Sequence, residues 1–279
     1  MEKRRDFLKK MGALAVGSAL LPSFTFAPKK VKNIGIQLYT FRKEMMIDPK
    51  GTLKIIADLG IKQVESASSN LGLFYGLKPA EMKQTCNDLG MTLRSGHTSI
   101  DSKWQDTIAQ ATESGQEYLI CSTLPYQGQT TANYQKVAER FNKAGEECKA
   151  ANIKFGFHNH NAEFQQDKDT GDVLYDVLLK NTDPKLVHME MDLGWVLAAG
   201  KDPFEYFKNY GARFPLWHLK DMKGRRSTEF GNGTLDIVGL LKHSKDAGMK
   251  YFFIEQEEYP VSALDSMKIN MAYMEKVDY

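Results

Sequence analysis

The chain has 279 residues, of which 42% are hydrophobic and 26% are charged. This composition is typical of a globular protein and excludes a mainly disordered or fibrous one. The 37 basic and 35 acidic residues leave a formal charge of +2, without the basic stripe that would indicate a nucleic-acid partner. The three cysteines are too widely spaced for a disulfide framework or a Cys-x-x-Cys metal site, so we expect buried thiols at Cys86, Cys121 and Cys148.

Residues 1–27 have the features of an export signal. A basic start at residues 3–5 precedes an apolar run over residues 11–21, which is too short to span a bilayer. The string Arg4-Arg5-Asp6-Phe7-Leu8-Lys9 resembles the twin-arginine export motif; the alternative is a general secretory signal. The resemblance implies a bacterial protein exported in folded form to the periplasm, with its cofactor inserted and without stable membrane insertion after cleavage. Cleavage removes five basic and two acidic residues and leaves a charge of about −1, which further disfavours nucleic acid.

From residue 31 onward, strand-like segments alternate with helical patterns. The strand-like segments are short, apolar and bounded by turn residues, and they are Ile34–Tyr39, Lys62–Ala67, Thr92–His97, Tyr118–Ser122, Lys154–His160, Leu186–Asp192, Pro215–Lys220 and Tyr251–Gln256. The helical patterns are each followed by Gly or Asn, and they are Pro49–Leu59, Pro79–Leu89, Tyr134–Ala151, Pro203–Tyr210 and Leu235–Ala247. Together they predict an α/β fold, a (β/α)₈ TIM barrel formed by residues 31–279 as a single domain; a doubly wound sheet is the competing layout. No Gly-x-Gly-x-x-Gly motif follows the first strand, which disfavours a dinucleotide-binding fold.

Carboxylates and imidazoles gather at the ends of the predicted strands. With their polar neighbours they are Gln37, Tyr39, Glu65, His97, His158, His160, Glu163, Glu190, Asp192, His218, Lys220, Asp221, Glu255 and Glu257. In a barrel these ends meet at the rim that carries the active site. Gathering these groups at one rim costs desolvation free energy, and the carboxylates repel one another, unless a cation offsets both effects. We therefore predict one divalent metal ion, whether Mn, Zn, Co, Mg or Fe.

Asp192, His218 and Glu255, from the sixth, seventh and eighth strands, are the strongest metal ligands. Asp192 could instead be only a helix N-cap, and His218 only a hydrogen-bonded core residue. Glu190 shares the face of Asp192 by strand alternation and is the better supporting partner. A fourth ligand is expected from the segment around His158, and the spacing does not choose between His158 and Glu163. We assign Glu163 as a ligand or acid–base residue.

The order of four motifs resembles the sugar phosphate isomerase/epimerase family of xylose isomerase-like TIM barrels. The motifs are His-Asn-His-x-x-Glu-Phe, Met-Glu-x-Asp-Leu-x-Trp, Trp-His-Leu-Lys-Asp-Met and Phe-Ile-Glu-Gln-Glu, and the similarity covers nearly all of residues 31–279. The resemblance implies a metal set of Glu, Asp, His and Glu, of which Asp192, His218 and Glu255 match the last three. The chain has His158-Asn159-His160 where many members have Glu-x-His. It also has Trp195 where epimerases often have a histidine, which suggests a stacking wall for a sugar ring.

This family chemistry removes a proton next to a sugar carbonyl, with a metal stabilising the enediolate. We therefore expect a sugar isomerase or epimerase with a small carbohydrate substrate; a homo-oligomer is compatible with this expectation. Glu163, Glu255 and Glu257 are the expected catalytic residues. The expected substrate contacts are Tyr39, His97, His158, His160, Trp195 and Lys220. Gly231-Asn232-Gly233 is expected to be a mobile loop near the metal.

Other functions stay open. One is a metal-dependent lyase, dehydratase or hydrolase-like enzyme acting on 3-keto-glycosides or inososes, through the same intermediate. An endonuclease IV-like phosphodiesterase is disfavoured by the low charge and the export signal. A sugar-binding barrel without catalysis is disfavoured by the Asp192, His218 and Glu255 set.

Overall fold

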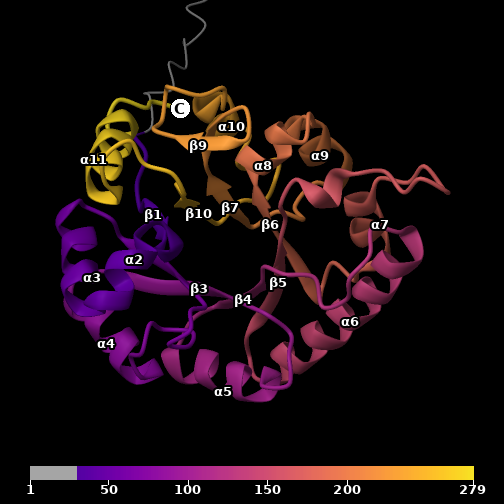
Figure 1. Cartoon of the computed structure of the whole chain (residues 1–279), viewed down its shortest axis with the longest axis horizontal. Coiled ribbons are helices and arrows are strands. Elements are labelled where there is room, and N and C mark those ends of the chain that lie inside the picture. Colours follow the sequence, from indigo (N-terminus) through magenta and orange to yellow (C-terminus); the bar gives the residue numbers. More distant parts are fainter. Residues whose placement is uncertain (1–29) are drawn as a thin grey trace, which may run out of the picture.

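Eight short apolar segments pair as parallel strands and close into a barrel in the computed structural model, which describes residues 30–279 (Figure 1). Each strand pairs with the next barrel strand along the chain, and the last pairs with the first through Gly35 opposite Phe253. The predicted (β/α)₈ TIM barrel is confirmed, and the doubly wound sheet is excluded. The predicted export signal, residues 1–27, lies outside the described residues. In chain order the barrel strands are β1 (Gly35–Gln37), β2 (Gln63–Ala67), β3 (Thr92–Thr98), β4 (Tyr118–Cys121), β5 (Lys154–His158), β6 (Val187–Asp192), β7 (Leu216–Leu219) and β10 (Tyr251–Ile254).

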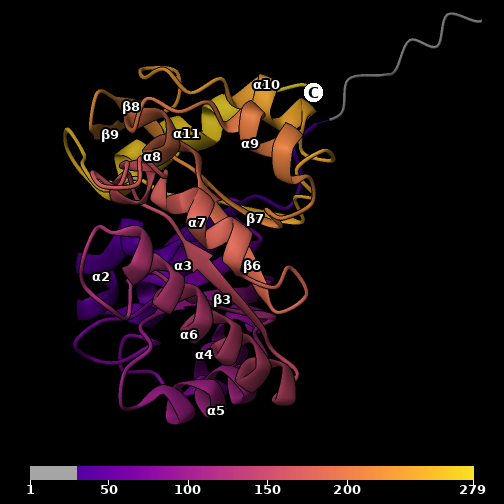
Figure 2. The ribbon, with the colours of Figure 1, turned by 90° about the vertical axis from the view of Figure 1, so that its right-hand side faces the viewer.

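Helices cover the outside of the barrel (Figures 1 and 2). The predicted helix starts at Pro49, Pro79 and Pro203 are confirmed. An aspartate caps two of these helices, because Asp48 and Asp202 each accept a backbone N–H at 2.9 Å. The helices are α2 (Arg42–Ile47), α3 (Pro49–Asp58), α4 (Pro79–Asp88), α5 (Trp104–Ser114), α6 (Thr131–Ala150), α7 (Leu174–Asn181), α8 (Leu193–Ala198), α9 (Pro203–Tyr210), α10 (Ile237–Lys242) and α11 (Ala263–Met274).

The helix predicted over Leu235–Ala247 is shorter than expected. The α-helix ends at Lys242, and the chain continues in tight turns in which the Asp246 N–H donates to the His243 carbonyl at 3.0 Å. The Asp246 carboxylate also bonds the His243 ring at 2.9 Å. These local bonds offer the chain an alternative to continuing the helix.

The inside of the barrel has an apolar layer below a polar one. Strand alternation turns every second side chain inward. Near the amino ends of the strands, Tyr118, Ile120, Leu216 and Phe253 form a separate buried cluster. Towards the carboxyl ends, the inward positions hold acidic and imidazole side chains instead. The polar layer therefore lies directly beneath the rim, where the site is expected.

The strands β1 and β5 each end two residues earlier than the sequence predicts, because side chains take over the backbone bonding. The amide of Asn159 accepts from the Asp192 N–H at 3.1 Å and donates to the Asp192 carbonyl at 3.3 Å. This amide replaces the sheet bonds that a longer β5 would make, so β5 ends at His158. In the same way the Gln37 side chain accepts from the Tyr39 N–H at 3.0 Å, and a 3₁₀ helix begins after β1.

After β7, an antiparallel hairpin of β8 (Asp221–Lys223) and β9 (Arg226–Thr228) precedes the Gly231-Asn232-Gly233 loop. This loop is anchored, contrary to the expectation of a mobile loop. The buried Asp221 carboxylate accepts the backbone N–H groups of Gly231 and Gly233 at 2.9 and 3.0 Å. It also accepts those of Met222 and Leu235, both at 2.9 Å. A Cβ at Gly233 would lie 2.2 Å from this carboxylate, so glycine is required there.

We expect Asp221→Ala to lower the free energy of unfolding by about 3 kcal/mol or more, because four backbone N–H groups lose a charged acceptor. Urea unfolding followed by circular dichroism measures this loss. The control is Asp246→Ala, which removes an exposed carboxylate and should have little effect. Equal unfolding free energies for the two variants would contradict the anchoring role of Asp221.

Cys86, Cys121 and Cys148 are all free and buried, as predicted. Burial raises the pKa of each thiol to about 12, which keeps it protonated and unreactive at neutral pH. Among residues 30–279, the structure contains no helix whose length and apolar character would suit a membrane crossing.

Candidate active site

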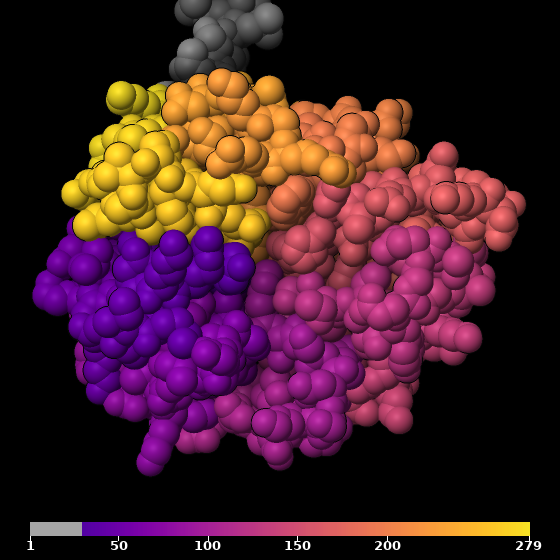
Figure 3. Space-filling model, viewed as in Figure 1, coloured from indigo at the N-terminus to yellow at the C-terminus, as the bar shows by residue number. Residues whose placement is uncertain are grey.

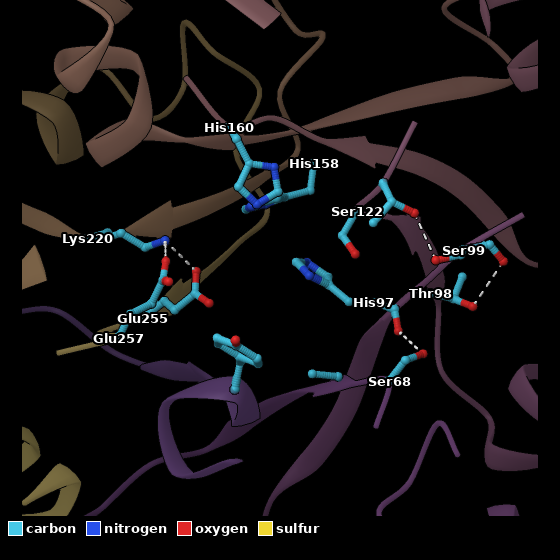
Figure 4. Close-up of a pocket in the computed structure, with 13 residues that line it drawn as sticks. Ser68, His97, Thr98, Ser99, Ser122, His158, His160, Lys220, Glu255 and Glu257 are labelled. Carbon is cyan, nitrogen blue, oxygen red and sulfur yellow. Dashed lines mark hydrogen bonds and ion pairs between the residues drawn. The ribbon is translucent and has the colours of Figure 1, made fainter. Parts of the chain in front are cut away.

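A cavity of about 340 Å³ opens at the carboxyl ends of the barrel strands. It corresponds to the hollow near the centre of the face in Figure 3, and Figure 4 shows its lining. Seven residues that we predicted as catalytic or substrate-binding line it: Tyr39, His97, His158, His160, Lys220, Glu255 and Glu257. Asp192 and His218 are buried beneath it. The structure therefore brings most of the predicted site together.

Four metal-type donors from the last four barrel strands meet at the floor of this cavity. We call them the outer set; one ligand atom of each lies within 4.8 Å of the others, and the residues are His158, Asp192, His218 and Glu255. His218 Nδ1 lies 2.7 Å from Glu255 Oε2 and 3.8 Å from Asp192 Oδ2. His158 Nε2 lies 3.9 Å from the same Asp192 oxygen. Two imidazoles and two carboxylates thus face one point.

Asp192 combines two roles that the sequence presented as alternatives. Its Oδ1 accepts from the Trp195 N–H at 2.9 Å and caps α8, while its Oδ2 faces the outer set. The cap fixes the carboxylate at the end of β6. Gly194 lets this turn approach β7, because a Cβ there would lie 2.4 Å from the Lys220 carbonyl.

Lys220, expected as a substrate contact, lines the cavity as a buried cation that is paired with carboxylates of the site. Its Nζ lies 2.8 Å from Asp192 Oδ2, 3.0 Å from Glu255 Oε2 and 2.6 Å from Glu257 Oε1. Burial alone would lower the pKa of Lys220, but these three carboxylates outweigh it and raise that pKa. The ammonium therefore stays charged and orders the acidic side of the cavity (Figure 4).

Glu163 and Trp195 lie outside the positions that we predicted for them. The Glu163 carboxylate accepts from the His160 N–H at 2.7 Å within the 3₁₀ helix Ala162–Phe164, so His158 and not Glu163 completes the outer set. Of the two residues that the sequence left open for the fourth ligand, His158 is the one close to Asp192, His218 and Glu255 in the structure. Trp195 does not line the cavity; its ring centroid lies 5.0 Å from Lys220 Nζ, as a cation–π contact. It covers the ammonium and offers no wall to a sugar in this cavity.

A hydrogen-bonded layer supports the outer set from below. Glu65 Oε1 lies 2.6 Å from His218 Nε2, which directs the other ring nitrogen of His218 to Glu255. Gln37 donates to Glu65 at 2.8 Å and Ser95 donates to it at 2.5 Å. A carboxylate behind a metal-ligating imidazole fixes its tautomer and raises its basicity. We had named Glu65 only as a strand-end residue, and this supporting role follows from the fold.

His97 and Glu190 form a second buried pair in the same layer, with His97 Nε2 at 2.6 Å from Glu190 Oε2. Burial would lower the pKa of His97, but the charges of Glu65 and Glu190 raise it to about 9. Burial and the neighbouring charge of Glu65 raise the pKa of Glu190 to about 7. Burial would likewise lower the pKa of His218, and Glu190 and Glu255 raise it.

The composition of the site fits a divalent metal ion. The outer set offers two imidazole nitrogens and two carboxylate oxygens, a donor mixture that suits Zn, Co, Mn or Fe. Asp192, Glu255 and Glu257 bring three carboxylates against the single ammonium of Lys220. A divalent cation would balance this excess of negative charge.

The hydroxyl groups of the cavity wall were not predicted from the sequence. Ser68, Ser99, Ser122 and Thr123 line the cavity from the loops after β2, β3 and β4. Ser99 and Thr123 bond each other at 2.8 Å, which ties two of these loops together. The available signal was the position of Ser and Thr directly after strands, but such residues are common in any loop.

A closed parallel barrel with its polar cavity at the carboxyl ends of the strands has the architecture of the TIM-barrel enzymes. Residues 53–277 match the xylose isomerase-like TIM barrel family, and the chain belongs to this family. A solved sugar phosphate isomerase/epimerase from Parabacteroides distasonis is similar at 28% identity, with a TM-score of 0.80 over 88% of this chain and 99% of that one. A second such structure from the same species gives 26% identity and a TM-score of 0.78, over 90% and 95% of the two chains.

Proteins named inosose dehydratase are also similar. The one from Clostridium perfringens is 27% identical over 150 residues, which cover 47% of this chain and 49% of that protein. The match therefore spans about half the length of that relative. The relatives thus include enzymes named as sugar phosphate isomerase/epimerase and as inosose dehydratase.

Proposed function

We propose that this chain is a divalent-metal-dependent sugar isomerase or epimerase that removes and returns a proton next to a carbonyl. The observation that carries the proposal is the outer set, four buried donors of His158, Asp192, His218 and Glu255 at the floor of the cavity. A metal bound there would supply Lewis-acid stabilisation of the enediolate oxygens. The cavity of about 340 Å³ is large enough for a monosaccharide and limits the reacting part of the substrate to about that size.

Two groups are suited to carry the proton. Glu257 lines the cavity, and the contact of its Oε1 with Lys220 Nζ at 2.6 Å positions this carboxylate where it could accept a proton from a bound substrate. His160 lines another side, with its ring centroid 4.9 Å from that of His158 (Figure 4). A base and an acid on different sides of one carbon permit removal of a proton from one face and return to the other.

Dehydration is the second candidate reaction, and the inosose dehydratase relatives favour it. It begins with the same proton removal and then expels a hydroxyl group from the neighbouring carbon. That step needs an acid for the leaving oxygen, which His160 is placed to supply. Product analysis separates the two reactions, because dehydration changes the molecular mass by one water.

The test is incubation with candidate keto-sugars, 3-keto-glycosides and inososes in deuterated water, before and after metal removal by a chelator. We expect deuterium next to the carbonyl in a metal-dependent reaction. Deuterium incorporation that persists undiminished in metal-free protein would overturn metal dependence. A metal-loaded protein that exchanges no proton on any of these substrates would overturn the proposed chemistry.

A nucleic-acid phosphodiesterase is not favoured by the cavity. Lys220 is the only lysine or arginine among its lining residues, and its ammonium is held by three carboxylates. Phosphate recognition needs free cationic or backbone N–H donors. The site instead combines acidic groups with hydroxyls, which suits a neutral polyhydroxylated substrate.

We also propose export to the bacterial periplasm through the twin-arginine route. A full-length Arg4→Lys/Arg5→Lys variant is expected to remain inside the cell, because the export receptor reads the arginine pair and not only its charge. Cell fractionation followed by immunoblotting measures the distribution. The control is Lys9→Arg/Lys10→Arg, which also keeps the charge. Unchanged export of the first variant would indicate a general secretory signal.

A further inference from the structure

A second ligand set lies beside the outer set and shares His158 and His218 with it. We call it the inner set: His97, His158, Glu190 and His218, each with one ligand atom within 4.8 Å of the others. His97 Nε2 lies 2.6 Å from Glu190 Oε2. His158 Nδ1 and His218 Nε2 each lie 3.3 Å from that same oxygen. We propose that the inner set is a second binding position for a divalent transition-metal ion such as Zn²⁺ or Co²⁺.

The two sets share two imidazole rings, which turn one nitrogen to each set. His158 directs Nδ1 to Glu190 and Nε2 to Asp192. His218 directs Nε2 to the inner layer and Nδ1 to Glu255. A neutral imidazole has one lone pair, so each ring ligates one ion at a time. The inner and outer sets are therefore alternative positions for a single cation.

Two atoms of the inner set lack partners. His158 Nδ1 and Glu190 Oε1 are buried and form no hydrogen bond in the structure, and their residues are 2% and 0% exposed. Buried polar atoms are almost always paired in folded proteins. An unpaired nitrogen and an unpaired carboxylate oxygen within one group of donors point to a ligand that both would contact. Three imidazoles with a carboxylate are a donor set that zinc and cobalt accept.

The charge balance of the two sets also favours a cation at the inner set. Asp192 and Glu255 of the outer set are held by the Lys220 ammonium. Glu65 and Glu190 of the inner layer are fully buried, and within residues 30–279 no lysine or arginine pairs with either. Two buried carboxylates without a permanent cation nearby would be balanced by one divalent ion.

The test uses Co²⁺ alone as the probe, with the full purified chain after metal removal. Asp192→Asn/Lys220→Met/Glu255→Gln removes the outer carboxylates together with the ammonium that they hold. We expect this triple variant to bind one Co²⁺ per chain, measured by elemental analysis and by the visible absorption of the bound ion. Addition of Glu190→Gln is expected to weaken binding by about 100-fold or more. Glu190→Gln alone should leave one ion bound in the outer set.

A triple variant that is folded by circular dichroism and binds no Co²⁺ would overturn the inner site. Equal Co²⁺ affinity with and without Glu190→Gln in that background would do the same. The single variant Asp192→Asn keeps the N-cap acceptor and provides the same comparison if the triple variant fails to fold. The inner metal position does not depend on which reaction the site catalyses. If wild-type protein binds Co²⁺ and the triple variant does not, only the inner site falls; if wild-type protein binds none, the proposed metal dependence falls too.

Discussion

The His218→Ala variant is expected to lose its bound metal and at least about 1,000-fold of the metal-dependent proton exchange. His218 is fully buried and is the one donor of the outer set that contacts both Glu65, through Nε2, and Glu255, through Nδ1. Its removal leaves two carboxylates without their imidazole partner and the metal with three donors. Loss of metal removes the Lewis acid, which contributes several kcal/mol to stabilising the charge that develops. Elemental analysis and deuterium exchange measure the two losses.

His218→Ala is also expected to lower the free energy of unfolding by about 3–5 kcal/mol, as for other buried pairs that lose one partner. His243→Ala is the matched control, because His243 is exposed and its ring pairs with Asp246 at the surface, away from the site. It should keep its metal, activity and stability. Full metal occupancy in a folded His218→Ala protein would contradict the site.

The Lys220→Met variant is expected to be less stable without metal and to bind metal more tightly. The methionine keeps most of the side-chain volume but removes the charge that holds Asp192, Glu255 and Glu257. The buried carboxylates then repel one another, and we expect a loss of about 3–5 kcal/mol in the metal-free protein. A divalent cation no longer competes with the ammonium for two of its oxygens, so the metal affinity should rise.

Thermal unfolding with and without added Zn²⁺ or Co²⁺ checks both effects. The increase in melting temperature on metal addition should be larger for Lys220→Met than for wild type, because binding to the folded state stabilises by mass action. Lys208→Met is the control, since Lys208 is exposed on α9. A smaller metal-induced increase in Lys220→Met than in wild type would show that the ammonium supports metal binding instead of competing with it.

The sequence predicted the barrel and the position of three of the four outer-set residues at its rim for the same physical reason. Buried parallel strands are short apolar runs, so their ends are visible in the sequence. A carboxylate or imidazole that interrupts such a run, as at Asp192, His218 and Glu255, must lie at the rim of the barrel. The start and end of each barrel strand were accordingly predicted to within about two residues.

The remaining features depend on contacts between distant segments. Glu163 and His158 are five residues apart, and only the path of the loop decides that Glu163 turns back to the His160 backbone. The contact of Glu65 with His218 joins residues 153 positions apart, on strands that are not neighbours. Trp195 and Lys220 were both expected to face the substrate, and in the structure they contact each other. Such compensation between side chains is invisible until the fold places them together.

The Lys220 ammonium has a consequence for the order of events during maturation. Many metal sites lack any charge of their own to offset their ligands, so the protein folds only as the ion binds. Here the Lys220 ammonium already neutralises part of the acidic cluster. We therefore expect the chain to fold first and to bind its ion afterwards, in the compartment where it folds before export, so that the metal supply of that compartment decides which ion the mature protein carries.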